Sequence, residues 1–170
     1  MNFSSFGEVA QEEKESILSL MGFKKIPMGN YYLRHYQSLA DYISSSMKEQ
    51  EMVIYDIYKS QFRGNTAVDN AIGKLVKEYE LLEFEKGSYI TLKRLNKIHI
   101  YHADVIEFVS AIEHLAVEGK YFNYLSIKDN LEDLKLSDLG FDEYFYQQLI
   151  RNTDQYKSLN AYTGIVFVKT

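Results

Sequence analysis

The 170-residue sequence has no cysteine, no tryptophan and only one proline. Without cysteine, the chain can form no disulfide framework, thiolate metal site or cysteine nucleophile. It also lacks an apolar run that approaches the roughly 20 residues needed to span a bilayer. Its first residues do not show the basic and then apolar order of a signal peptide. We therefore expect a cytoplasmic protein that makes no membrane contact.

Basic side chains are outnumbered by acidic ones. The chain carries 24 acidic and 19 basic side chains, a net charge of −5, whereas a dedicated DNA-binding protein usually carries a strong basic field. The imbalance is concentrated in residues 102–143, which hold ten acidic and three basic side chains, while residues 57–101 hold five acidic and eight basic ones. Coulomb repulsion makes the acidic stretch a poor phosphate binder and a candidate surface for a protein partner.

Apolar and aromatic residues are abundant. Hydrophobic residues make up 46% of the chain, with 15 tyrosines and 10 phenylalanines, which is ample for a globular core. We expect most aromatic side chains to build cores and interfaces. Stacking on nucleic-acid bases is the alternative use of such side chains.

Residues 66–92 have the most regular pattern in the chain. In their first part, apolar residues recur at the spacing of a helix with one buried face: Val68, Ala71, Ile72, Leu75, Val76 and Tyr79. In their second part, apolar and polar residues alternate on both sides of Lys86, Gly87 and Ser88. The stretch therefore predicts a helix followed by a two-stranded hairpin.

The segments before and after this stretch also contain periodic patterns. Before it, we predict helices over residues 8–21, over about 31–46 with Asn30 as the cap, and over 51–62, then a turn at 63–65. After it, we predict the following elements: a helix over 102–119, a short strand over 121–125, a helix capped by Ser126, a helix over 143–151 capped by Asp142 or, if the turn is tighter, by Asp138, and a hairpin over 156–168. The last strand, 165–168, is apolar enough to be buried on both faces.

The predicted order of two helices, a turn, a third helix and a hairpin therefore occurs twice. Leu75-Val76-Lys77 and Leu149-Ile150-Arg151 take matching places in the two third helices. This layout resembles that of tandem winged-helix proteins. Their group includes DNA-binding regulators, plasmid replication initiators and the small acidic accessory subunits of chromosome-organising complexes. The resemblance implies an α+β, mainly helical fold with an N-terminal helical extension (1–30), a first winged-helix unit (31–98) and a second (99–170).

The resemblance also implies a function. In winged-helix proteins the third helix commonly enters the major groove of DNA, and the hairpin, or wing, contacts the backbone. We therefore expect a DNA-binding regulatory or replication-type protein that uses the first unit. The candidate residues combine side chains that read bases with cations that meet phosphates. They are Asn65, Thr66, Asn70, Lys74, Lys77, Lys86, Lys93 and Arg94.

Two further expectations follow from the DNA-binding hypothesis. The third helix of the second unit is a weaker candidate for DNA contact, through Gln147, Gln148, Arg151 and Asn152. A regulator also predicts a homodimer that reads two half-sites. The helix over residues 8–21 lies outside both units and is the candidate for pairing or for docking onto them.

An alternative function belongs to a different class. In it the protein is a non-catalytic accessory subunit whose winged helices mediate protein–protein interaction through the acidic second unit. Catalytic patterns are weak by comparison. Gly64 and Gly73-Lys74 lack the spacing of a phosphate-binding loop, and His99, His102 and His114 lack the spacing of metal ligands. We predict no enzymatic activity, no metal site and no cofactor.

Overall fold

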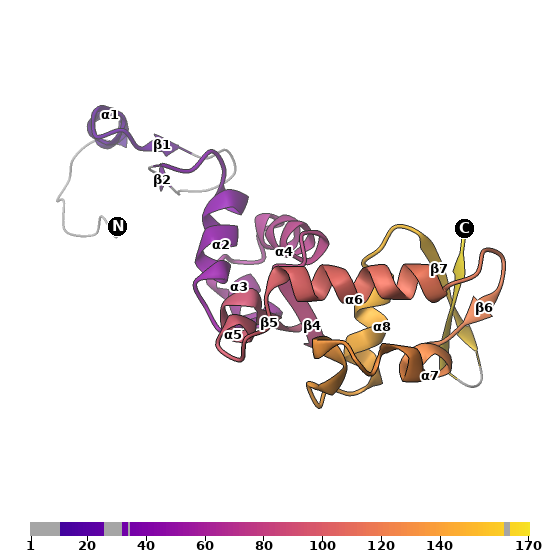
Figure 1. Ribbon diagram of the computed structural model, residues 1–170. Coiled ribbons are helices and arrows are strands. Elements are labelled where there is room, and N and C mark those ends of the chain that lie inside the picture. Colours follow the sequence, from indigo (N-terminus) through magenta and orange to yellow (C-terminus); the bar gives the residue numbers. More distant parts are fainter. Residues whose placement is uncertain (1–10, 26–31, 34, 162–163) are drawn as a thin grey trace.

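The computed structural model describes residues 11–25, 32–33, 35–161 and 164–170 (Figure 1). Within them the chain is α+β and mainly helical, as the sequence predicts, and it contains two small antiparallel sheets of three strands. Figure 1 shows helix α1 (Gln11–Leu20) at one end of an elongated molecule and the second sheet at the other. None of the helices in these residues is both long and apolar enough to cross a bilayer.

The first repeat of elements begins after the N-terminal segment. It runs in this order: α2 (Leu39–Lys48), β3 (Met52–Ile54), α3 (Tyr55–Gln61), α4 (Ala67–Lys77), β4 (Leu81–Glu85) and β5 (Ser88–Thr91). The sheet order is β3-β5-β4, with all pairs antiparallel. The predicted helix and hairpin of residues 66–92 are therefore confirmed. Helix α4 buries Val68, Ala71, Ile72 and Leu75.

The N-terminal third differs from the prediction at several places. Helix α1 falls within the predicted 8–21, but the predicted helix start near Asn30 lies outside the described residues. Strand β2 (Tyr32–Leu33) pairs with β1 (Lys24–Lys25) where a helix was predicted. Helix α2 begins only at Leu39, because the Ser38 hydroxyl accepts the Asp41 N–H at 3.1 Å and caps it there.

Two boundaries in the first repeat were also predicted wrongly. Helix α2 continues through Ser44–Ser46 to Lys48, because burial of Ile43 and Met47 outweighs the low helix preference of serine. Residues 52–54, predicted to be helical, form strand β3 and pair with β5. Three residues are too few for an alternating pattern to stand out beside the adjoining helix.

The second repeat follows a short connecting helix, α5 (Leu92–Asn96), which the sequence pattern did not indicate. It runs in this order: α6 (His102–Leu115), β6 (Tyr121–Phe122), α7 (Tyr124–Ile127), α8 (Glu143–Arg151), β7 (Tyr156–Ala161) and β8 (Gly164–Lys169). Two 3₁₀ turns, η1 (Lys128–Leu131) and η2 (Lys135–Asp138), lie between α7 and α8. The sheet order is β6-β8-β7, so both repeats share one order of elements and one order of strands.

Of the three predictions made for the caps and the last strand of the second repeat, one is confirmed and two are wrong. Asp142 caps α8 as predicted, since its carboxylate accepts the Phe145 N–H at 3.4 Å. Ser126 is not the cap of the preceding helix. Asn123 caps α7 instead and accepts the Ser126 N–H at 2.8 Å. Strand β8 is not buried on both faces, because only Phe167 is fully enclosed.

The two hydrophobic cores meet on strand β4. Successive side chains of a strand point to opposite faces, and here each face belongs to a different core. Leu81 packs in the first core with α2 and α4, while Leu82 packs in the second core with α6 and α8. Leu92 and Leu95 of α5 also join the second core. Helix α8 therefore lies against the outer face of the first sheet.

Aromatic rings line this junction. The rings of Phe84 on β4 and Phe141 lie 5.9 Å apart, and Phe141 stacks on Phe145 of α8 at 4.3 Å. Phe145 meets Tyr146 edge to face at 5.1 Å, and Tyr146 stacks on Tyr124 at 4.4 Å. The contacts run without a break from the first sheet into the second core. Aromatic pairs of this geometry stabilise a fold by more than the burial of their apolar area alone.

Removing the centre of this ring series should destabilise the whole protein. Phe145 is fully buried, so Phe145→Ala should lower the free energy of unfolding by about 3–5 kcal/mol through lost burial and a cavity. Urea denaturation followed by circular dichroism measures the change. Leu125→Ala, at a 58% exposed position, is the control and should cost less than about 0.5 kcal/mol. Equal effects of the two substitutions would contradict the packing described.

Candidate nucleic-acid interface

Helix α4 presents one polar face to solvent. Its apolar side packs in the first core, so the opposite side faces solvent. Asn70, Lys74 and Lys77 on the helix and Thr66 just before it are all exposed. Four of the eight predicted residues therefore lie on a single accessible helix face.

The beginning of α4 is fixed by Asn65 and the turn before it. The Asn65 side-chain oxygen accepts the Ala67 N–H at 2.8 Å, which satisfies one of the free donors of the helix start. Arg63 and Gly64 have φ angles of 51° and 74°, so the chain reverses in the left-handed region. Because its oxygen is engaged and its side chain is half-buried, Asn65 positions the helix.

A cluster of three polar side chains joins α3 to α4. The Tyr55 hydroxyl donates to one Asp69 oxygen and the Lys59 ammonium donates to the other, each at 2.8 Å. Lys59 also donates to the Gly64 carbonyl oxygen at 3.1 Å. The hydrogen bonds from Lys59 and Tyr55 lower the pKa of Asp69, and the bond to Asp69 raises the pKa of both Lys59 and Tyr55. The cluster fixes the angle between the two helices.

The tip of the β4–β5 hairpin lies at the same end of the first unit as the start of α4. The Gly87 carbonyl oxygen accepts the Tyr55 N–H at 2.8 Å, and Tyr55 in turn reaches Asp69. Gly87 has a φ of 74°, a conformation that favours glycine. Lys86, which precedes it, is exposed and forms no ion pair within the described part of the chain. The hairpin tip therefore adds one free cation to this end.

Lys93 and Arg94 lie elsewhere. They belong to α5, which follows the far end of β5, and the register from Glu85↔Ser88 to Leu81↔Thr91 places that end away from the hairpin tip. The Lys93 ammonium is 3.0 Å from the Glu49 carboxylate, and the Arg94 guanidinium is 2.9 Å from that of Glu51. The structure therefore places these two residues away from the hairpin tip and pairs each with a glutamate.

Carboxylates accompany both lysines of the α4 face. The Lys74 ammonium is 4.0 Å from Asp41 of α2, and the Lys77 ammonium is 3.5 Å from Asp154, which follows α8. All four side chains are exposed, so the pairs contribute little stability and can exchange for other partners. They also reduce the positive potential that the lysines offer to a polyanion.

The weaker candidate helix of the second unit is enclosed. Gln147 and Gln148 are each 8% exposed, and the Gln147 amide donates to the Glu143 carboxylate at 2.7 Å. The prediction that these glutamines contact DNA is therefore wrong. The physical reason is that α8 packs against β4, so its polar positions face the protein. Arg151 and Asn152, at the end of the helix, are the accessible residues of that set.

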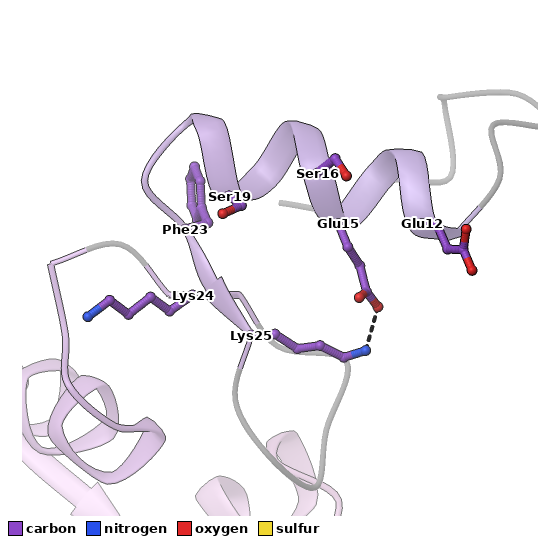
Figure 2. A pocket seen from close by; sticks show the side chains of 7 residues that line it. All are labelled: Glu12, Glu15, Ser16, Ser19, Phe23, Lys24 and Lys25. Carbon is purple, nitrogen blue, oxygen red and sulfur yellow. Dashed lines mark hydrogen bonds and ion pairs between the residues drawn. The ribbon is translucent and has the colours of Figure 1, made fainter.

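The other grooves and side-chain clusters of the described residues show no catalytic arrangement. A shallow groove of about 520 Å³ lies beside α1. Figure 2 shows the side chains that line it, among them Glu15, which pairs with Lys25. Its lining mixes charges of both signs with serines and one ring. A search of the described residues finds no group of three His, Cys, Asp or Glu side chains that could hold a metal ion. His102 instead links the two repeats, with its Nε2 atom 2.9 Å from the Glu78 carbonyl oxygen.

Comparisons with protein-family models, curated proteins and solved structures found no match for this chain. Its candidate functions therefore rest on the geometry of its own side chains.

The Tyr55–Lys59–Asp69 cluster should make stability depend on acid pH. Because the pKa of Asp69 is lowered in the folded state, its contribution is complete above the unfolded value of about 3.9 and is lost as pH falls through the folded value. The denaturation midpoint of Asp69→Asn should therefore lie below that of the parent protein at pH 7, and the gap should narrow below pH of about 4.

Asp56→Asn is the matched control, since Asp56 is an exposed α3 carboxylate with no hydrogen bond or ion pair in the described residues. Both carboxylates lie in the first turn of a helix, so Asp56→Asn should show only the small helix-dipole effect that the two positions share. A gap for Asp69→Asn that stayed constant from pH 7 to pH 3 would show that the carboxylate charge does not stabilise the helix pair.

Proposed function

We propose that the protein is a tandem winged-helix protein that binds double-stranded DNA through the first unit alone. Support for the fold comes from the order helix, strand, helix, helix, strand, strand, with the first strand beside the last, in both repeats. Support for the interface comes from one observation. Thr66, Asn70, Lys74 and Lys77 share the open face of α4, at the position where winged-helix proteins place their recognition helix.

Each side chain has a distinct role in this proposal. Asn70 and Thr66 approach base edges, because an amide can pair bidentately with adenine and a hydroxyl can donate or accept. Lys74 and Lys77 exchange their exposed carboxylates for phosphates, and Lys86 at the hairpin tip meets the flanking backbone. Lys93 and Arg94 take no part, since they belong to α5, away from the hairpin tip and outside the open face of α4.

The second unit acts as a brace in this proposal. Its third helix, α8, is buried against the first sheet and holds β4 in place. One chain therefore offers one reading helix, and high affinity for a two-part site requires two chains.

A second candidate function is favoured by a specific observation. Asp41 and Asp154 stand beside the two α4 lysines, and residues 102–143 carry ten acidic side chains against three basic ones. Surfaces of this kind suit a basic protein partner better than a polyanion. In this alternative the protein is a non-catalytic accessory subunit.

The salt dependence of DNA binding tests the proposal. Three phosphate contacts, from Lys74, Lys77 and Lys86, predict a slope of log affinity against log salt of about −3 on duplex DNA. Fluorescence anisotropy with a mixed-sequence duplex across a salt series measures this slope. Lys74→Gln/Lys77→Gln should reduce its magnitude to about 1.

Lys93→Gln/Arg94→Gln is the matched control, because it also removes two positive charges, but from α5 and not from the open face of α4. It should preserve most of the slope. If both double variants weaken binding equally, the α4 face is not the contact. If the parent protein binds no DNA at low salt, the DNA proposal fails and the accessory-subunit function takes its place.

A further inference from the structure

The outer face of the second sheet is apolar and uncovered. Its strands present alternate residues to the two sides, and Phe122, Ile165 and Phe167 pack inward on the second core. Register places Tyr121 beside Val168 and Leu159 beside Val166 on the outward side. Tyr121 is 65% exposed and Leu159 is 50% exposed. An apolar sheet face of this kind normally packs on another layer.

In the first unit, the corresponding face of the sheet is covered by such a layer. The first sheet has the same strand order, and its outward residues Leu82, Phe84 and Ile90 pack against the second core, where α8 lies across β4. A helix with apolar residues on one face thus completes the first unit. Within the described residues, no helix takes the corresponding position on the second sheet.

Among the elements that the structure describes, helix α1 has a matching free face. Ile17, Leu20 and Met21, spaced i, i+3 and i+4, form one stripe and are 49%, 89% and 46% exposed. The first turn of α1 carries Glu12 and Glu13. Glu13, four residues before Ile17, extends the stripe, which is therefore apolar at one end and acidic at the other.

Charge also matches between the two surfaces. The outward side of the second sheet carries Lys157, opposite Val168 in the register, and Lys120 lies next to Tyr121. Neither lysine forms an ion pair within the described residues, and neither does Glu12 or Glu13. A helix with an acidic start and an apolar end fits a basic-edged apolar face.

We propose that α1 of a second copy of this chain covers the outer face of the second sheet. Within one molecule the two surfaces lie at opposite ends (Figure 1), so the contact joins two copies. Exchange in both directions gives a twofold dimer with two identical contacts, which is the commonest symmetry of soluble oligomers. This inference does not depend on DNA binding.

Sedimentation velocity of the full chain tests the dimer. The parent protein should dimerise, and Leu20→Glu or Leu159→Glu should each raise the dissociation constant at least about tenfold by placing a charge in the apolar contact. Ile98→Glu is the control, at a 53% exposed position outside both surfaces, and should leave the constant unchanged. A parent protein that stays monomeric at about 100 μM overturns the proposal.

Disulfide trapping identifies which surface covers the second sheet. The chain has no cysteine of its own, so only the introduced cysteines can form a disulfide. A mixture of Leu20→Cys and Leu159→Cys proteins should form the mixed disulfide in preference to either symmetric one. A dominant symmetric Leu159→Cys product would mean that two sheet faces stack on each other, which overturns the assignment to α1. The assignment to a second copy would also be overturned if one chain that carries both Leu20→Cys and Leu159→Cys formed an intramolecular disulfide at high dilution.

Discussion

The packing of α8 on the outer face of the first sheet is the contact on which the rest of the structure depends. Leu82 on one side and Phe145 on the other are fully enclosed, and the rings from Phe84 to Tyr124 continue the contact into the second core. The alternation of β4 makes this possible, because Leu81 and Leu82 serve different cores. Removing either unit would expose a sheet or helix face that is now buried, at a cost of about 25 cal/mol for each Å² of apolar surface.

This packing leaves the third helices of two architecturally similar units differently exposed. The third helix of the first unit, α4, keeps its polar face in solvent, whereas α8 buries both of its glutamines. The same packing places Asp154, at the end of α8, beside Lys77 of α4. The second unit thus supports the proposed reading helix and also places a negative charge beside it. Any nucleic acid or protein partner that binds α4 must displace that carboxylate.

The sequence predicted most elements whose apolar period is long and whose caps are strong. Helix α4, the β4–β5 hairpin and α8 with Asp142 as its cap all lie where the pattern places them. The sequence pattern failed where a segment is too short to show a period, or where packing between distant segments decides the structure. Strand β3 has three residues, and α2 runs through serines that are favoured at helix ends. Among the candidate residues, Lys93 and Arg94 belong to a helix of five residues that looks like the continuation of a strand. Burial of Gln147 and Gln148 arises from packing between units, which no local pattern encodes.

Native-state hydrogen exchange in low urea tests the coupling of the two units most directly. The amides of Leu75 in α4 and Leu149 in α8 both belong to fully packed helix interiors, one in each core. If α8 and the first sheet form one cooperative body, both amides should exchange through the same opening, with equal free energies and equal dependence on urea. If the Leu149 amide exchanges at a lower free energy, with a weaker urea dependence, while Leu75 stays protected, the second unit opens independently and the account is contradicted.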